Sequence, residues 1–152
     1  MGLTLSFITA SSSAIILEAF KDDDYDLFDD NIIKEADFSL HLKPRDLQIL
    51  SLCASEFNAK KPMNLRKQMT LLLDDEEKGL FEIESKWVSY FGTVPLEQSK
   101  NLCGRWFEVM NRKYPKEKIE ITEEAIEAVK NLILICQFCI NNKTDLFHYW
   151  TL

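Results

Sequence analysis

The densest group of side chains able to bind a cation or move a proton is the segment Asp22–Asp30, which holds six Asp in nine residues. This acidic segment places Asp at the first, third and fifth positions of an EF-hand-like loop. Leu27 stands where that loop needs glycine for its sharp turn, and Ile33 stands where a bidentate glutamate closes the cage. We therefore expect a solvated acidic surface and assign no metal ligands, with a weak, irregular cation site as the alternative.

Cysteines are the next candidates for chemistry. Cys136 and Cys139 form a Cys-x-x-Cys pair more than a dozen residues into an apolar helix that begins after Thr122. A redox dithiol needs a thiol near a helix N-terminus, and zinc needs two further ligands at paired spacing. The other two are Cys53 and Cys103, and three of the four cysteines fall among aliphatic or aromatic residues at core-like spacing. We therefore interpret the cysteines as reduced, and Cys136 and Cys139 as core residues.

The two histidines, His41 and His148, both fall in predicted strands that could pair with each other. A histidine pair without a carboxylate or third ligand is not a site. We place His41 on a polar strand face. The position of His148 stays open, because Leu146 and Trp150 share its strand parity.

Signatures of an enzyme are not found. The sequence has no Gly-x-Ser-x-Gly elbow and no glycine-rich phosphate loop, and it contains only 4 Gly. Carboxylates are so numerous that no single pair stands out. No catalytic residue and no cofactor is assigned.

Charge is distributed unevenly along the chain. Residues 1–58 carry 11 acidic and 4 basic side chains, whereas residues 59–152 carry 14 of each, which gives a net charge of -7. Such a surface repels nucleic acid and anionic membranes. The best basic stretch, residues 111–118, is short and is followed by Glu120, Glu123 and Glu124.

These observations favour a non-catalytic, acidic protein-binding module, for example an immunity-type or inhibitory protein that docks on a basic partner. Tyrosine and tryptophan near the C-terminus would extend this surface. The predicted partner-binding residues are Asp22, Asp23, Asp24, Tyr25, Asp26, Asp29, Asp30, Tyr149 and Trp150. The alternatives are a carboxylate-based enzyme or weak metal-binding protein centred on the acidic segment and His41, and a homo-oligomer that uses the terminal strand as an edge.

The elements that position these residues follow from hydrophobic periodicity. Alternating residues predict strands near 2–9, 36–42 and 145–152, and Ser11–Ser13 predicts the start of a helix that runs to Phe20. Helical spacing predicts four successive helices between Pro44 and Pro115, followed by the long apolar helix after Thr122. We predict an α+β fold in one domain, residues 1–152: five or six helices packed on an antiparallel sheet of about three strands that includes both chain termini.

Targeting signals are weak. Met1-Gly2 with Ser6 matches an N-myristoylation pattern by letter, but the alternation from Leu3 to Phe7 favours a strand. The longest apolar run, residues 132–140, is too short to cross a membrane. We expect a cytoplasmic monomer or small homo-oligomer without membrane or nucleic-acid partners.

Overall fold

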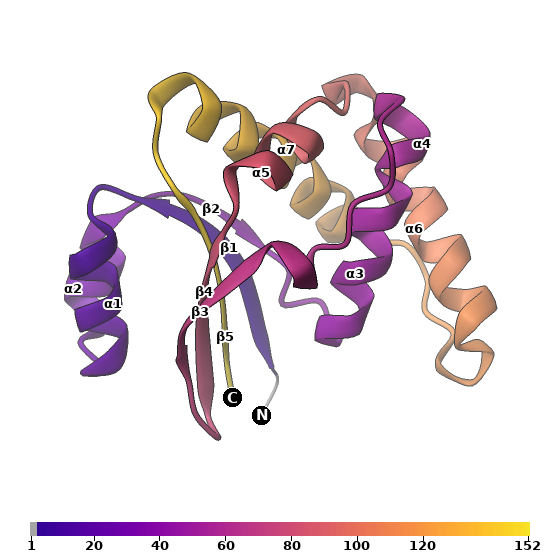
Figure 1. The fold of residues 1–152 in the computed structure, drawn as a ribbon. Coiled ribbons are helices and arrows are strands. Elements are labelled where there is room, and N and C mark those ends of the chain that lie inside the picture. Colours follow the sequence, from indigo (N-terminus) through magenta and orange to yellow (C-terminus); the bar gives the residue numbers. More distant parts are fainter. Residues whose placement is uncertain (1–2) are drawn as a thin grey trace.

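A five-stranded antiparallel sheet runs through the middle of the molecule (Figure 1). The computed structural model describes residues 3–152. The spatial order of the strands is β2-β1-β5-β4-β3. Their bounds are Thr4–Ala10 for β1, Ile32–Asp37 for β2, Met69–Asp74 for β3, Lys78–Ile83 for β4 and Leu146–Thr151 for β5.

Helices account for most of the remaining chain and confirm the predicted α+β class. Within residues 3–152, six helices have at least seven residues: α1 (Ser13–Lys21), α2 (Tyr25–Asn31), α3 (Pro44–Cys53), α5 (Ser85–Gly92), α6 (Ser99–Lys113) and α7 (Glu123–Asn142). A single turn, α4 (Ser55–Asn58), follows α3. The sheet is larger than predicted, because it has five strands and not about three.

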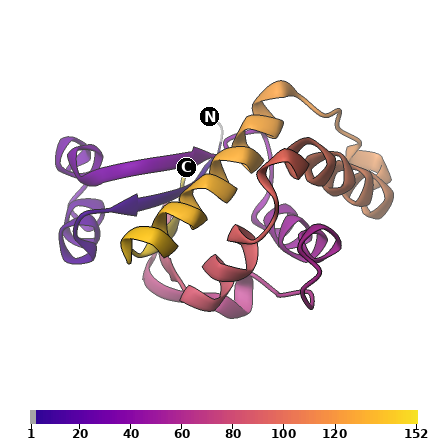
Figure 2. The same ribbon diagram turned by 90° about the horizontal axis from the view of Figure 1, so that it is seen from above.

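The two faces of the sheet carry separate hydrophobic cores. Helices α1 and α2 lie on one side of the sheet and the other helices lie on the opposite side (Figures 1 and 2). The larger core contains Trp87, Trp106 and Phe38, all almost fully buried. The smaller core, under α1 and α2, is built around Phe20, Phe28 and neighbouring strand residues. The helix pair α1–α2 is therefore a small separate layer.

Strand β5 joins these cores, because it lies between β1 and β4. Its side chains alternate between the faces, as strand geometry requires. Leu146 and Trp150 belong to the larger core, whereas Phe147 and Tyr149 belong to the smaller one. The predicted terminal strand is thus confirmed, but it occupies the centre of the sheet and is not an edge.

The main error of the sequence prediction concerns residues 62–83. Helical spacing predicted one helix from Pro62 to Leu73 and another from Leu80 to Gly92, but the chain forms the β3–β4 hairpin and only then α5. A bulge between Leu71 and Leu73 inserts Leu72, so Leu72 and Leu73 both pack against the smaller core. The bulge therefore gives the apolar residues of this strand the i, i+3, i+4 spacing that is typical of a helix.

The predicted strand at residues 36–42 is also displaced. Strand β2 ends at Asp37, whose carboxylate accepts a hydrogen bond from the Ser39 N–H at 2.9 Å. The Ser39 hydroxyl in turn accepts from the Leu5 N–H at 3.2 Å. Side-chain hydrogen bonds of this kind replace the backbone hydrogen bonds between strands and so end a strand. His41 then has a left-handed φ of 61° and lies outside any strand.

Both predicted helix starts are confirmed. The hydroxyl of Ser12 accepts from the Ile15 N–H, and that of Thr122 accepts from the Ala125 N–H. The myristoylation pattern and the first residue of the predicted N-terminal strand rest on Met1 and Gly2, which lie outside the described residues. Across residues 3–152, no helix combines the length and apolar character needed to cross a membrane.

Gly79 on β4 allows a close approach of the strand opposite. A Cβ atom added at Gly79 would collide with Nε1 of Trp150, its cross-strand partner. We expect Gly79→Ala to lower the free energy of unfolding by about 1–3 kcal/mol, because the indole must move. This cost should largely vanish in a Trp150→Ala background, as measured by urea denaturation.

Gly104 on α6 provides the matched control. A Cβ atom there would have no neighbour within 4 Å. Gly104→Ala should therefore stabilise the protein by about 0.5–1 kcal/mol through helix propensity. Equal costs of Gly79→Ala in the two backgrounds would contradict the assigned contact.

Candidate functional site

The acidic segment forms a turn and a short helix. Asp23 adopts a left-handed φ of 56° after α1, and the Asp24 N–H donates to the Ala19 carbonyl at 2.9 Å. These are features of a Schellman cap. The Asp24 carboxylate then accepts from the Leu27 N–H at 3.1 Å and so caps α2. Part of the Asp run therefore has a local structural role.

The remaining carboxylates of the segment are accessible to solvent. Asp22, Asp26, Asp29 and Asp30 are all exposed, and so is Tyr25, whose exposed fraction is 69%. No three Asp, Glu, His or Cys side chains within residues 3–152 are arranged to hold a metal ion. The exposed group therefore has the properties of a charged surface.

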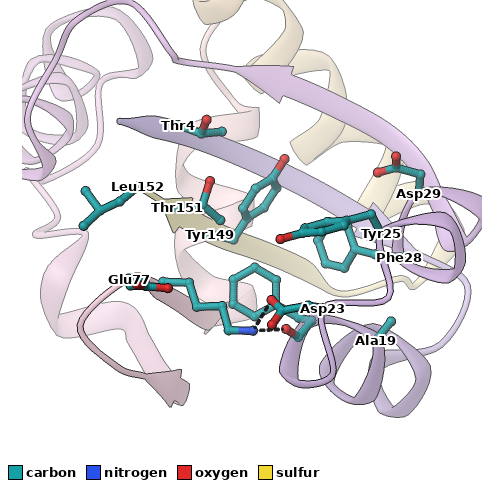
Figure 3. Close-up of a pocket in the computed structure, with 12 residues that line it drawn as sticks. Thr4, Ala19, Asp23, Tyr25, Phe28, Asp29, Glu77, Tyr149, Thr151 and Leu152 are labelled. Carbon is teal, nitrogen blue, oxygen red and sulfur yellow. Dashed lines mark hydrogen bonds and ion pairs between the residues drawn. The ribbon is translucent and has the colours of Figure 1, made fainter. Parts of the chain in front are cut away.

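A pocket of about 200 Å³ lies between α1–α2 and the sheet (Figure 3). We call it the α1–α2 pocket. Its wall includes three aromatic rings that meet one another: Phe20 and Phe28 at 5.5 Å between centroids, and Phe28 and Tyr149 at 5.3 Å. Its remaining lining residues are Thr4, Ala19, Asp23, Tyr25, Asp29, Glu77, Lys78, Thr151 and Leu152.

Of the lining residues within 3–152, Lys78 is the one with a basic side chain. Its side chain is only 13% exposed. Its ammonium group donates to the Phe20 carbonyl at 2.5 Å, to the Lys21 carbonyl at 3.3 Å and to the Asp23 carboxylate at 2.7 Å. A cation at the carbonyl end of α1 is stabilised by the helix dipole. Lys78 therefore fastens the α1–α2 layer to the hairpin, and its donors are already used.

Tyr149 has its phenol tied to the sheet. The Tyr149 hydroxyl donates to Oε2 of Glu35 at 3.0 Å, and the Ser6 hydroxyl donates to the same oxygen at 2.6 Å. Burial, and then the negative charge of Glu35, raise the pKa of Tyr149 well above its ordinary value. The phenol is therefore a neutral donor and no base.

The structure separates the two aromatic residues predicted to bind a partner. Tyr149 lines the α1–α2 pocket with Asp23, Tyr25 and Asp29. Trp150 packs on the other face of the sheet with the larger core. Because neighbouring strand residues point to opposite faces, one pocket cannot use both. The sequence already indicated this separation, because Tyr149 and Trp150 are consecutive residues of a predicted strand.

The cysteine prediction is confirmed, because all four are buried and free. Burial raises the pKa of Cys53 to about 11 and that of Cys103 to about 12. It also raises the pKa of Cys136 well above the ordinary value, with a further contribution from Cys139. Thiols with a raised pKa stay protonated at neutral pH and are therefore poor nucleophiles.

The two histidines do not pair. His41 is exposed, whereas His148 on β5 is only 3% exposed. Nδ1 of His148 lies 2.9 Å from the Ser6 carbonyl, so this nitrogen carries the proton of the neutral ring. Burial lowers the pKa of His148 to about 4, despite that hydrogen bond.

One acidic pair was not singled out by the sequence analysis. Glu82 on β4 and Asp145, just before β5, line a shallow hollow near Thr70. Burial, and then the charge of Asp145, raise the pKa of Glu82. They lie far apart in sequence, so only the β4–β5 pairing shows that they meet.

No protein-family model, curated protein or solved structure matches this chain. The site must therefore be interpreted from its own geometry.

His148 gives a pH dependence that can be measured. Below about pH 6.5 the unfolded chain protonates this side chain, whereas the folded protein does not until about pH 4. The free energy of unfolding should therefore fall as the pH is lowered through this window. Between pH 7 and 4.5 we expect His148 to account for a loss of about 2–3 kcal/mol.

Urea denaturation of the wild type and of His148→Gln at these two pH values isolates this contribution. Carboxylates contribute to both proteins, so the informative quantity is the difference between their pH-dependent losses. Equal losses in the two proteins would show that His148 becomes protonated over the same pH range in the folded and the unfolded chain, which would contradict the lowered pKa.

Proposed function

We propose that the protein is a non-catalytic binding module that docks on a basic segment of a protein partner through α1–α2. The observation that carries this proposal is the combination of exposed carboxylates and an aromatic-walled pocket on one small layer. Asp22, Asp26, Asp29 and Asp30 lie on its surface. None of these four forms an ion pair within residues 3–152.

Charge complementarity supports a basic partner. Unpaired surface carboxylates attract cationic segments over a distance set by ionic strength, and they increase association rates. The layer itself contains one basic residue, Lys21, beside the six Asp of the acidic segment. A basic partner therefore meets little repulsion from α1–α2 itself.

The dimensions and lining of the α1–α2 pocket suit one side chain of that partner. Its volume of about 200 Å³ is below the roughly 300–1,000 Å³ of small-molecule sites. Asp23, Asp29 and Glu77 outnumber Lys78 in its lining, and the aromatic faces favour a cation. Arginine fits best, because its planar guanidinium stacks on rings and pairs with carboxylates.

The pocket lining supports binding over catalysis. Among the described residues that line it there is no His, Cys or Ser. The Lys78 ammonium group is engaged with α1 and Asp23, and the Tyr149 phenol with Glu35.

An oligo-arginine peptide provides a defined probe for this proposal. We expect wild-type protein to bind it with an affinity that decreases as salt increases, as measured by isothermal titration calorimetry. Replacing Asp22, Asp26, Asp29 and Asp30 with Asn should weaken binding at least tenfold and flatten the salt dependence. Tyr25→Ala should weaken binding about two- to fivefold and leave the salt dependence unchanged.

The matched control neutralises four other exposed carboxylates. Glu76, Glu97, Glu120 and Glu127 replaced with Gln change the net charge equally but lie outside α1–α2. This variant should retain most of the affinity. Equal weakening in the two fourfold variants, or no binding by the wild type at low salt, would contradict the proposal.

A further inference from the structure

We propose that the exposed edge of β3 is a self-association site at which two copies of the chain pair antiparallel across a two-fold axis. This inference concerns a different surface from α1–α2 and does not depend on the function proposed above. It rests on three features of residues 66–77: open backbone groups, an uncharged apolar strand and flanks of opposite charge.

The sheet has two edges, β2 and β3. Natural edge strands carry charges that discourage pairing with another chain. Three of the six residues of β2 are charged, namely Lys34, Glu35 and Asp37. In contrast, β3 has no charge from Met69 to Leu73. The part of β3 before the bulge at Leu72 therefore lacks the charges that protect β2.

Backbone groups on this edge are directed away from the sheet. The Glu84 N–H donates to the Gln68 carbonyl at 2.8 Å, just before the Met69–Ile83 pair of the β3–β4 ladder. Hydrogen-bonded and non-hydrogen-bonded pairs alternate in an antiparallel ladder. The N–H and C=O groups of Met69 and Leu71 therefore point outward, where another strand can accept and donate.

Leu71 adds apolar area at the centre of this edge. Its exposed fraction is 55%, the highest among the leucines, isoleucines and phenylalanines that precede the C-terminal residue. A two-fold axis near Leu71 brings the two Leu71 side chains together on one face, where each removes the other from water. An isologous contact of this kind closes as a dimer.

Charges at the two ends of β3 select the antiparallel orientation. Arg66 and Lys67 precede the strand, and the run from Asp74 to Glu77 ends it. An axis through Thr70 brings the 3-10 turn Arg66–Gln68, which carries both basic residues, toward the end of the partner copy's strand at Asp74. An axis through Leu71 brings the same basic turn toward the partner copy's acidic run from Asp74 to Glu77. Parallel pairing would instead place like charges together.

These flanking charges are free to pair between copies. Within the described part of the chain, no ion pair involves Arg66, Lys67 or the run Asp74–Glu77. Asp75 has a separate role, because its carboxylate accepts from the N–H groups of Glu77 and Lys78 in the hairpin turn. Variants that test the association should therefore leave Asp75 unchanged.

Sedimentation velocity over a range of protein concentrations tests the proposal. Wild-type protein should shift from one chain to two as concentration rises. The pair Arg66→Glu and Lys67→Glu should raise the dimer dissociation constant at least tenfold, and so should the pair Asp74→Lys and Glu76→Lys. Combining all four changes should restore the dimer, because the ends are again complementary.

Controls separate this contact from net charge and from misfolding. Lys60→Glu with Lys61→Glu changes net charge as much as the first pair does, at exposed residues outside β3, and should leave the dimer intact. Circular dichroism should show equal folding of all variants. A wild type that stays monomeric at several hundred micromolar, or a fourfold variant that fails to recover while folded, would overturn the proposal.

Discussion

The position of β5 between β1 and β4 is the constraint on which the rest of the structure depends. This strand ends at Thr151, yet it pairs with the first strand of the chain on one side and with a hairpin from its middle on the other. Without β5 these two parts of the sheet share no strand contact. The cost of closing so long a loop is met by backbone pairing and by side-chain burial on both faces.

Alternation along β5 also determines what the candidate site can contain. Tyr149 reaches the α1–α2 pocket because it shares a face with Phe147, whereas Trp150 is directed to the layer of α3, α5, α6 and α7. The thin α1–α2 layer leaves room for a pocket, and Lys78 holds that layer to the sheet. A thicker layer on this face would have covered the aromatic wall.

Much of this arrangement could be predicted from the sequence, and the predictions that were wrong failed for physical reasons. The caps at Ser12 and Thr122, the apolar helix α7 and the terminal strand follow from local rules. The β3–β4 hairpin was missed because the bulge at Leu72 gives a strand the spacing of a helix. The pocket required knowledge that Lys78, Tyr149 and the acidic segment converge, which depends on long-range pairing that local patterns do not encode.

Native-state hydrogen exchange tests the central role of β5 most directly. If β5 joins the two cores, the amides of β5 and β1 should exchange only through global unfolding, with a free energy equal to that from urea denaturation. The amides of α2 should exchange through a smaller local opening. Amides of β5 that exchange as readily as those of α2 would contradict this account.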